Sequence, residues 1–348
     1  MAPPRLTFFC ELTPEPLQAL FGKAGEEKRR LIADLLKLQA NLSLGIIDLS
    51  QERAEVVQRL NQAGVPVIAW LLLPKDEGYW FNLDNVLQAV ARYAAFQAWT
   101  VENGLRWEGI GLDIEPDIGE ITQFAKGNLR LLPGVVRRLF NRRRLLDGRA
   151  RYQELIAQIH ADGYQVESYQ FPIIADERLA HSTLLQRGIG LVDLVVDREV
   201  WMMYTSFVRP NGAGLLASYA AEAQALALGS TGGGVDSEFG QFTPLTWGEL
   251  ERDLRLAWHY CSDLYIFSLE GCVQQDFMPR LRDFAWDHPM MIPEQGLAKA
   301  RGLRGALQSA LWIARNIWWI LAGSAAGFVF WKVLERWLRK TGFLKSKV

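Results

Sequence analysis

Short apolar runs alternate with longer amphipathic segments over residues 5 to 290 of the chain. Most of the runs are bounded by glycine, proline, asparagine or aspartate, as strand ends usually are. The predicted strands are residues 5–12, 42–49, 66–73, 108–115, 164–171, 199–206, 224–231 and 263–270. In segments between them, such as 26–42 and 52–64, apolar positions recur every three or four residues, which indicates helices.

Eight strands that alternate with helices predict a parallel sheet, and the number eight favours closure into a (β/α)8 TIM barrel. An open doubly wound sheet is the alternative. No glycine-rich phosphate-binding loop follows the first predicted strand, which argues against that alternative as a nucleotide-binding fold. We therefore expect a barrel whose functional residues lie at the C-terminal ends of its strands.

The fourth predicted strand ends in the sequence GIGLDIEPD, residues 109–117, which places two acids on one face. Side chains alternate across a strand, so Asp113 and Glu115 point the same way, and Pro116 ends the strand. Two adjacent acids raise each other's proton affinity, so that one can stay protonated and act as a general acid. The alternative is an acid pair that caps the next helix or pairs with an arginine.

The stretch WEGIGLDIE, residues 107–115, resembles the fourth-strand motif of family 18 glycoside hydrolases, the chitinase-like barrels, which reads D-G-x-D-x-D-x-E. The first acid of that motif falls on Glu108, the middle acid on Gly111, and the last two on Asp113 and Glu115. The resemblance implies that Glu115 is the proton donor. It also implies that Asp113 orients the acetamido group of the substrate, which acts as an internal nucleophile.

The stretch WMMYTS, residues 201–206, is similar to the sixth-strand motif M-x-Y-D of the same family. It implies that Tyr204 contacts the acetamido group and that Met202 lies beside it. The chain departs from the family pattern where Gly111 replaces the middle acid and Thr205 replaces the aspartate after the tyrosine. The eighth strand also lacks the tryptophan that usually forms the floor of the sugar site, and Phe267 is the candidate to take its place.

Other polar and aromatic residues are expected at the same end of the barrel, near the ends of the first, third, fifth and eighth strands. Aromatic faces there could stack on sugars, although a buried aromatic core is the more common arrangement. A second acid facing Glu115 would permit a two-carboxylate mechanism. These further substrate-binding candidates are Glu11, Trp70, Glu167, Tyr169, Met202, Phe267 and Glu270.

An arginine-rich segment, residues 126–153, interrupts the alternation between the fourth and fifth strands. A helix with a solvated basic face is the simplest interpretation. A surface that binds anionic lipid is the alternative, because basic residues alternate with leucine and valine there. The candidate lipid contacts are Arg137, Arg138, Arg142, Arg143 and Arg144.

The C-terminal region contains an uncharged apolar stretch, residues 316–331, with basic residues on both sides. Extended to residue 337, it reaches the roughly 20 residues that a membrane-spanning helix needs. Tryptophans near both ends are typical of an aromatic belt, and Gly323 and Gly327 would let two such helices self-associate. A helix that lies on the barrel or on the membrane surface is the alternative. The predicted segments are a barrel (1–292), a basic juxtamembrane linker (293–315), a transmembrane helix (316–337) and a basic tail (338–348).

Composition narrows the class of protein. The formal net charge is −1, which argues against a nucleic-acid-binding protein. The 4 histidines are scattered and the 3 cysteines show no close pairing, so we expect neither a metal nor a cofactor. The N-terminal sequence is not typical of a secretory signal, which favours a single-pass protein with its barrel in the cytoplasm, although the basic tail argues for the opposite orientation.

The sequence predicts a membrane-anchored glycosidase that acts on sugars, including N-acetylated ones. A carbohydrate-binding barrel that has lost catalysis, and a scaffold protein at the membrane, are the two alternatives.

Overall fold

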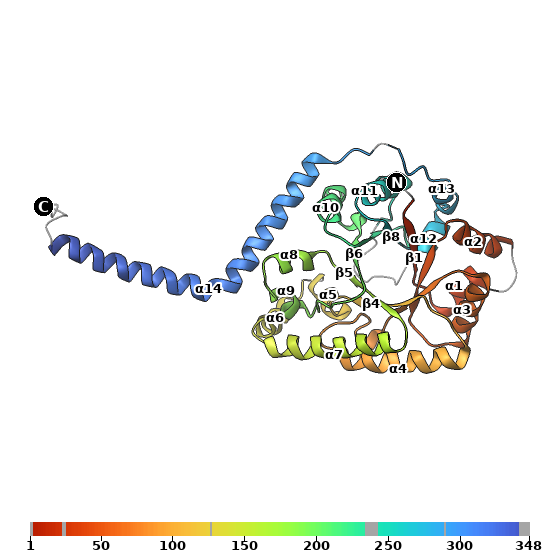
Figure 1. The fold of residues 1–348 in the computed structure, drawn as a ribbon, viewed down its shortest axis with the longest axis horizontal. Coiled ribbons are helices and arrows are strands. Elements are labelled where there is room, and N and C mark those ends of the chain that lie inside the picture. Colours follow the sequence, from red (N-terminus) through yellow and green to blue (C-terminus); the bar gives the residue numbers. More distant parts are fainter. Residues whose placement is uncertain (1–2, 23–25, 126, 234–242, 289, 341–348) are drawn as a thin grey trace.

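The computed structural model describes residues 3–22, 26–125, 127–233, 243–288 and 290–340, with the backbone alone for part of them, mostly in 318–340. Eight parallel strands close into a barrel in chain order, with β1 paired to both β2 and β8 (Figure 1). The predicted (β/α)8 barrel is confirmed. The strands are β1 Arg5–Cys10, β2 Asn41–Ile46, β3 Val67–Leu71, β4 Gly109–Ile114, β5 Gln165–Gln170, β6 Arg198–Met203, β7 Ala225–Gly229 and β8 Asp263–Phe267.

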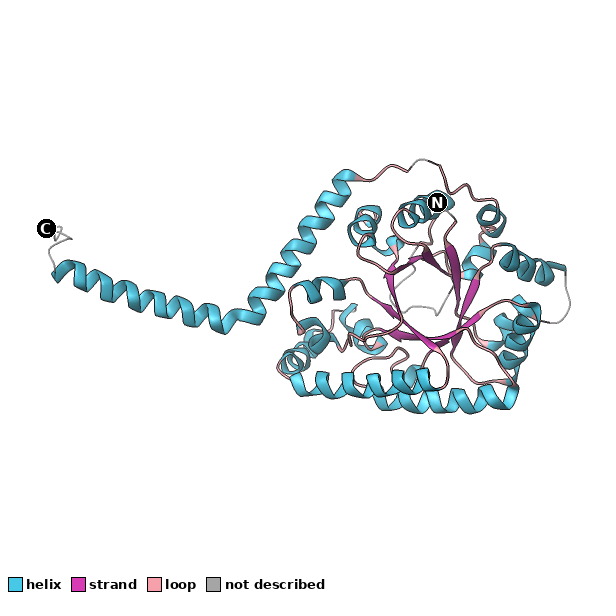
Figure 2. Cartoon of the chain, in the orientation of Figure 1, coloured by secondary structure: helices cyan, strands magenta, loops and turns pink. Residues whose placement is uncertain are grey.

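Helices surround the barrel as an outer layer (Figure 2). Local capping explains several of their ends: the Ser50 hydroxyl accepts a hydrogen bond from the Arg53 amide at the start of α3, and Gly64 ends α3 in the left-handed conformation. The helices are α1 Pro14–Phe21, α2 Glu26–Lys37, α3 Gln51–Ala63, α4 Val86–Asn103, α5 Ile118–Ala125, α6 Leu132–Leu139, α7 Arg142–Ala161, α8 Ile173–Leu179, α9 Leu184–Ile189, α10 Gly212–Ala220, α11 Trp247–Trp258, α12 Leu269–Gln274, α13 Met278–Arg282 and α14 Glu294–Lys340.

The alternation of side chains along the strands divides the apolar interior into two layers. One face of each strand packs against the surrounding helices and forms the larger core. The other face fills the inside of the barrel with a smaller cluster that is mainly aromatic toward the C-terminal ends of the strands. In that cluster the ring centroid of Phe9 lies 5.1 Å from Trp70 and 4.8 Å from Tyr169. The interior of the barrel is therefore a packed core and not a pore.

The loop after β3 folds back along the end of β4. The Phe81 amide donates to the Asp113 carbonyl at 2.8 Å, and the Glu115 amide donates to the Phe81 carbonyl at 3.2 Å. These two bonds extend the sheet by one bridge, between Phe81 and Ile114. The loop therefore fixes the backbone on both sides of Ile114, between the two predicted catalytic acids.

Helix α14 is longer than any segment that the sequence predicted in this region. It begins at Glu294, packs against α10 and α8 along its first part, and then extends away from the barrel (Figure 1). Arg304 anchors the docked part: its Nε donates to Asp176 at 2.9 Å, and its guanidinium lies 3.8 Å from the centre of the Tyr219 ring. The predicted boundary between linker and transmembrane helix, at residues 315 and 316, falls inside this one helix.

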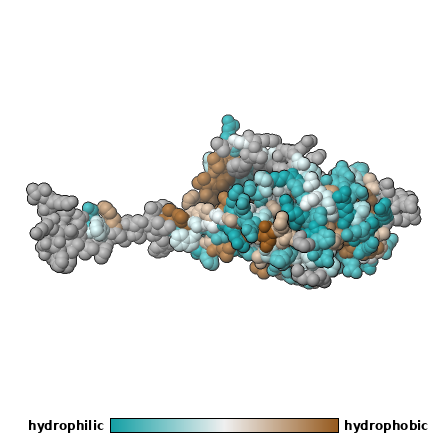
Figure 3. All heavy atoms as spheres, turned by 90° about the horizontal axis from the view of Figure 1, so that it is seen from above, coloured by the Kyte–Doolittle hydropathy of each residue, from teal (hydrophilic) through white to brown (hydrophobic). Residues whose placement is uncertain are grey.

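Exposed apolar side chains, Trp312, Ile313 and Ile317, occur where α14 leaves the barrel, and hydrophobic surface is visible in that region in Figure 3. Within the part of the chain that the structure describes, however, no helix has both the length and the apolar character needed to cross a membrane. The predicted transmembrane helix 316–337 is therefore not supported. Most side chains of that segment, and residues 341–348 of the predicted basic tail, lie outside the described ones.

Candidate functional site

The mouth of the barrel is formed by residues that directly follow the strands or lie in their last positions. Glu11, Glu115 and Tyr204 are the first residues after β1, β4 and β6, and Phe267 is the last residue of β8. Parallel strands end on the same side of a barrel, so these four side chains converge there. This topology brings Glu115 and Tyr204 to the same end of the barrel, as the sequence predicted.

Asp113 lies just inside the mouth and is almost fully buried, with an exposed fraction of 2%. The indole Nε1 of Trp70 donates to its Oδ2 at 3.0 Å. No N–H group of the described residues meets the buried Oδ1. The remaining hydrogen-bond partner of this carboxyl is the carboxyl of Glu115, which is only partly buried. Asp113 is thus held between one neutral donor and a second acid.

The pKa values of both carboxyls are raised, so the pair retains a proton more readily than an isolated carboxyl would. Burial raises the pKa of Glu115 well above its ordinary value, and the charge of Asp113 and the hydrogen bond between the two carboxyls raise it further. Burial also raises the pKa of Asp113, and Glu11 adds to that effect. Neither acid pairs with a cation among the described residues. The hydrogen bond between the two carboxyls raises the pKa of Glu115 and lowers that of Asp113, so it favours the proton on Glu115.

Tyr204 and Phe267 form one wall of the mouth, with ring centroids 5.4 Å apart. Burial raises the pKa of the Tyr204 hydroxyl, and the charges of Asp113 and Glu115 raise it further, so this hydroxyl lies near both acids and stays protonated. Met202 is buried in the same cluster, two residues before Tyr204 and on the same face of the strand. Tyr204 can therefore donate a hydrogen bond to a ligand held over Asp113 and Glu115.

Glu11 brings a third acid close to the pair. The Tyr79 hydroxyl donates to its Oε1 at 2.5 Å, and the Glu11 amide donates to Oε1 of Glu270 at 3.2 Å. Burial and the charge of Glu11 raise the pKa of Tyr79, which remains a donor. Tyr79 was not predicted as a site residue. Its contact could not be foreseen because it joins the β3 loop to β1.

A side chain larger than glycine does not fit at Gly111, the position that aligned with the middle acid of the resembled motif. A Cβ atom at Gly111 would lie 2.3 Å from the hydroxyl oxygen of Tyr169 and 2.6 Å from two ring carbons. The Tyr169 ring on β5 thus occupies the space above Gly111, and its hydroxyl forms a 2.8 Å hydrogen bond with Ser43. A carboxylate cannot be accommodated at Gly111 while Tyr169 keeps this position.

Glu167 lies deeper in the barrel than the predicted substrate site. It accepts hydrogen bonds from Tyr265 and from Arg198, both at 2.8 Å, and from Tyr169 at 3.3 Å. In the strand register Glu167 is level with Gly111, two residues below the level of Asp113. The structure therefore places Glu167 in a buried ion pair inside the barrel, while Asp113 and Glu115 lie nearer the mouth.

Thr205 points away from the mouth. Its hydroxyl donates to the buried carboxyl of Asp253 on α11. A Cβ atom at Gly212 would lie 2.6 Å from the Thr205 Cβ, so α10 packs closely over this residue. The Thr205 side chain thus connects the end of β6 to α11 and points away from the predicted site.

Trp70 also differs from its expected role as a sugar-stacking face. Its exposed fraction is 4%, and it packs against Phe9 and Tyr169 inside the barrel. The residue positions Asp113 through its Nε1–H group. Phe267, which is partly exposed and lies 6.4 Å from Trp70 between ring centroids, is the aromatic side chain that can face a ligand.

Comparisons with known proteins leave the family open. No family model matches the chain, and no curated protein does. Among solved structures, the glycoside hydrolase domain of PgaB (BpsB) from Bordetella bronchiseptica is 11% identical over 81% of this chain and 98% of that domain, with a TM-score of 0.47. A mutant tryptophan synthase alpha-subunit from Pyrococcus furiosus is 12% identical over 87% of this chain and 100% of that subunit, with a TM-score of 0.34. At these scores neither likeness carries functional information, and the barrel rests on its own strand order.

Proposed function

We propose that this protein is a glycoside hydrolase in which Glu115 protonates the leaving oxygen of the substrate. The observation that carries the proposal is the hydrogen-bonded pair of Asp113 and Glu115 at the mouth of a TIM barrel, where no cation of the described residues pairs with either acid. Glycosidic bond cleavage needs a carboxylic acid that is still protonated near neutral pH. The raised pKa of Glu115 supplies such an acid, and its partial exposure leaves it accessible to a ligand.

Asp113 and Tyr204 favour a substrate with an N-acetyl group beside the scissile bond. An acetamido group carries one N–H donor and one carbonyl acceptor. A charged Asp113 would accept from the N–H group, and the Tyr204 hydroxyl would donate to the carbonyl oxygen. This arrangement would hold the carbonyl oxygen as an internal nucleophile, so that no second catalytic carboxylate is required.

A carbohydrate-binding barrel without catalysis is the second candidate. It is favoured by Gly111, where Tyr169 occupies the space of the family's middle acid. Without that acid, Glu115 is the carboxyl with which Asp113 can share a proton, and the Trp70 N–H group supplies a hydrogen bond only. The two candidates predict the same ligands and differ only in turnover.

Hydrolysis of a panel of aryl glycosides, with and without an N-acetyl group, distinguishes the two candidates. The full chain should release aryl alcohol from at least one sugar, and on glycosides with a poor leaving group Glu115→Gln should reduce kcat by a factor of about 10² to 10⁴. Glu108→Gln is the matched control, because Glu108 belongs to the same motif but is exposed at the other end of β4. Binding of a sugar without hydrolysis by any of the three proteins would support the second candidate.

A further inference from the structure

The segment between β4 and β5 forms a basic corner that the proposed hydrolysis does not use. Residues 127–146 contain six arginines and no acid. They form α6 and the first turns of α7, at the edge of the barrel (Figure 1). We use the name basic corner for Arg130, Arg137, Arg138, Arg142, Arg143 and Arg144, together with the side chains between them.

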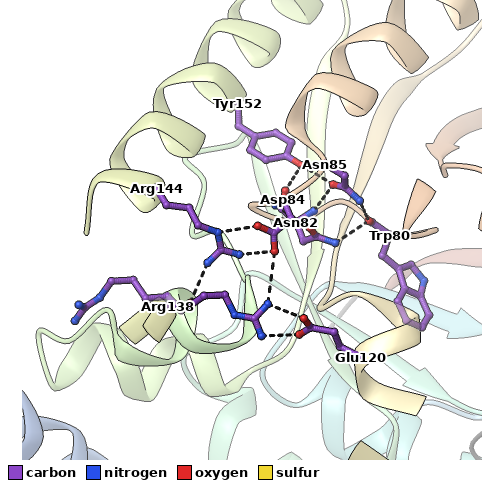
Figure 4. A network of polar contacts seen from close by, with 9 residues as sticks. Trp80, Asn82, Asp84, Asn85, Glu120, Arg138, Arg144 and Tyr152 are labelled. Atoms are coloured by element: carbon purple, nitrogen blue, oxygen red, sulfur yellow. Dashed lines mark hydrogen bonds and ion pairs between the residues drawn. The ribbon is translucent and has the colours of Figure 1, made fainter. Parts of the chain in front are cut away.

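Two of the arginines hold the corner in place from within (Figure 4). Arg138 donates to both oxygens of Glu120 on α5, at 2.6 and 2.7 Å. Arg144 donates to Asp84 through its Nε at 2.7 Å, and Asp84 belongs to the loop that crosses the end of β4. Bidentate pairs of this kind fix orientation, so the corner is a preformed surface.

The remaining arginines face solvent with little or no compensation. Arg130, Arg137 and Arg142 form no ion pair with another described residue. Arg143 lies 3.6 Å from Asp147, but both side chains are largely exposed, and such pairs neutralise little. Arg130 and Arg137 also line an open cavity of about 400 Å³. Arg138 and Arg144 line it too, but Glu120 and Asp84, which belong to the same lining, balance their charges. The guanidinium groups of Arg130 and Arg137 make the cavity suitable for a phosphate group.

Apolar side chains are exposed beside these charges. Leu132, Val136 and Phe140 follow one another at intervals of four residues, so they form a row along α6, and their exposed fractions are 45%, 51% and 75%. Leu146 on α7 adds a fourth exposed apolar side chain, at 59%. The sequence predicted a basic face here, but only the structure shows that the apolar residues between the arginines are exposed as well.

We propose that the basic corner docks on the surface of a membrane that contains anionic lipids. Arginines beside exposed large apolar residues are the combination that holds a helix in the interface, because the apolar side chains enter the boundary of the acyl chains while the cations meet lipid phosphates. The row from Leu132 to Phe140 enters the interface, and the cavity at Arg130 and Arg137 receives a headgroup phosphate. A nucleic acid would use the arginines but would leave the apolar row exposed to water. The docking does not depend on catalysis at Glu115.

Co-flotation of the full chain with phosphatidylcholine vesicles, with and without phosphatidylserine, tests the proposal. Binding should require phosphatidylserine and should weaken as salt is raised, since the Debye length falls from about 10 Å at 0.1 M to about 3 Å at 1 M. The double variant R130S/R137S should bind about 25-fold more weakly, from about fivefold for each arginine. The matched control R30S/K75S removes the same charge from exposed positions outside the corner and should bind normally.

The apolar row has its own variant. Phe140→Ser should weaken vesicle binding about tenfold or more, because a large apolar side chain no longer leaves water. Val195→Ser is the control, since Val195 is equally exposed, at 79%, but lies on a loop before β6. Equal binding to both kinds of vesicle, or unchanged binding by R130S/R137S and Phe140→Ser, would overturn the proposal. So would binding of inorganic phosphate at the cavity without any binding of vesicles.

Discussion

Two acidic sites inside the same barrel have opposite surroundings. Glu167 on β5 is met by the Arg198 guanidinium and by two tyrosine hydroxyls. Asp113 on β4 is met by one indole N–H group and by a second carboxyl, that of Glu115. Burial raises the pKa of Glu167 as well, but Tyr265 and Arg198 counteract the rise. At Asp113 and Glu115 no cation in the part of the chain that the structure describes does so.

The difference separates an acid that serves the fold from acids that are available for chemistry. A buried carboxylate with a cation and donors is satisfied in its charged form, and removing it leaves its partners unpaired. A buried acid beside another acid is satisfied only when one of the two is protonated, which is costly for stability and useful for proton transfer. We therefore expect substitutions at Glu167 to affect stability, and substitutions at Asp113 and Glu115 to affect activity.

The largest expected contrast is in turnover. Asp113→Asn should lower kcat on any aryl glycoside that the protein hydrolyses by about 10²-fold, because an amide cannot share the Glu115 proton or carry the charge that holds an acetamido group. Its free energy of unfolding should not fall, since Trp70 can still donate to the amide oxygen. Chemical denaturation, run in parallel with the kinetics, would contradict this separation if activity and stability fell together.

The converse substitution tests the acid inside the barrel. Glu167→Ala should lower the free energy of unfolding by about 3 kcal/mol, because Arg198 and Tyr265 lose their common acceptor. Asp147→Ala is the control, since Asp147 forms an ion pair with Arg143 at an exposed position, and its loss should cost less than about 0.5 kcal/mol. Equal denaturation midpoints for the two variants would remove the distinction drawn here.

A substitution at Gly111 should have an intermediate effect on stability, because the Tyr169 ring fills the space above it. Gly111→Ala should lower the free energy of unfolding by roughly 1 to 3 kcal/mol, because its Cβ would force the Tyr169 ring to move. Adding Tyr169→Ala should cost less than the sum of the two single substitutions, as expected for residues in contact. Gly302→Ala on α14 has no atom near its new Cβ and should be neutral or stabilising. Additive costs for Gly111 and Tyr169 would contradict the steric explanation.

The smallest expected effect is the pH dependence of stability. The raised pKa of Glu115 means that the folded protein binds its proton more tightly than the unfolded chain does. That contribution is fully present below the unfolded pKa, near pH 4, and is lost as the pH rises through the folded value. Glu115→Gln does not show this loss of stability with rising pH, because a glutamine side chain does not titrate. The variant should therefore gain stability relative to the wild type as the pH rises from 5 to 8, and a constant difference across this range would contradict the assignment.

The hydrophobic pattern predicted the barrel because strand and helix periods are local properties of the sequence. All eight predicted strands are present, and each ends one to three residues earlier than expected; Glu115, for example, lies just after β4. The face shared by Asp113 and Glu115 follows from the same alternation. Contacts between distant strands were beyond such patterns: the Tyr169 ring over Gly111, the Tyr79 hydroxyl on Glu11, and the outward turn of Thr205 all depend on packing between elements.

The C-terminal region shows the same limit. Composition alone indicated a linker followed by a membrane span, but the first part of α14 is docked on the barrel by Arg304, which forms a buried ion pair with Asp176. Arginines in that stretch appeared as flanking charges in the sequence. The sequence around a residue such as Arg304 does not show that the residue is buried, because its partner, Asp176, is distant in the chain.

The dependence of Glu115→Gln on the leaving group tests the central claim most directly. An aryl leaving group of low pKa departs without protonation, whereas a poor leaving group needs the acid. If Glu115 is the proton donor, Glu115→Gln should retain much of the wild-type kcat/KM on the most activated aryl glycoside and lose about 10²-fold or more on the least activated one. An equal loss across the whole series would show that Glu115 has another role, and full activity throughout would contradict the proposed site.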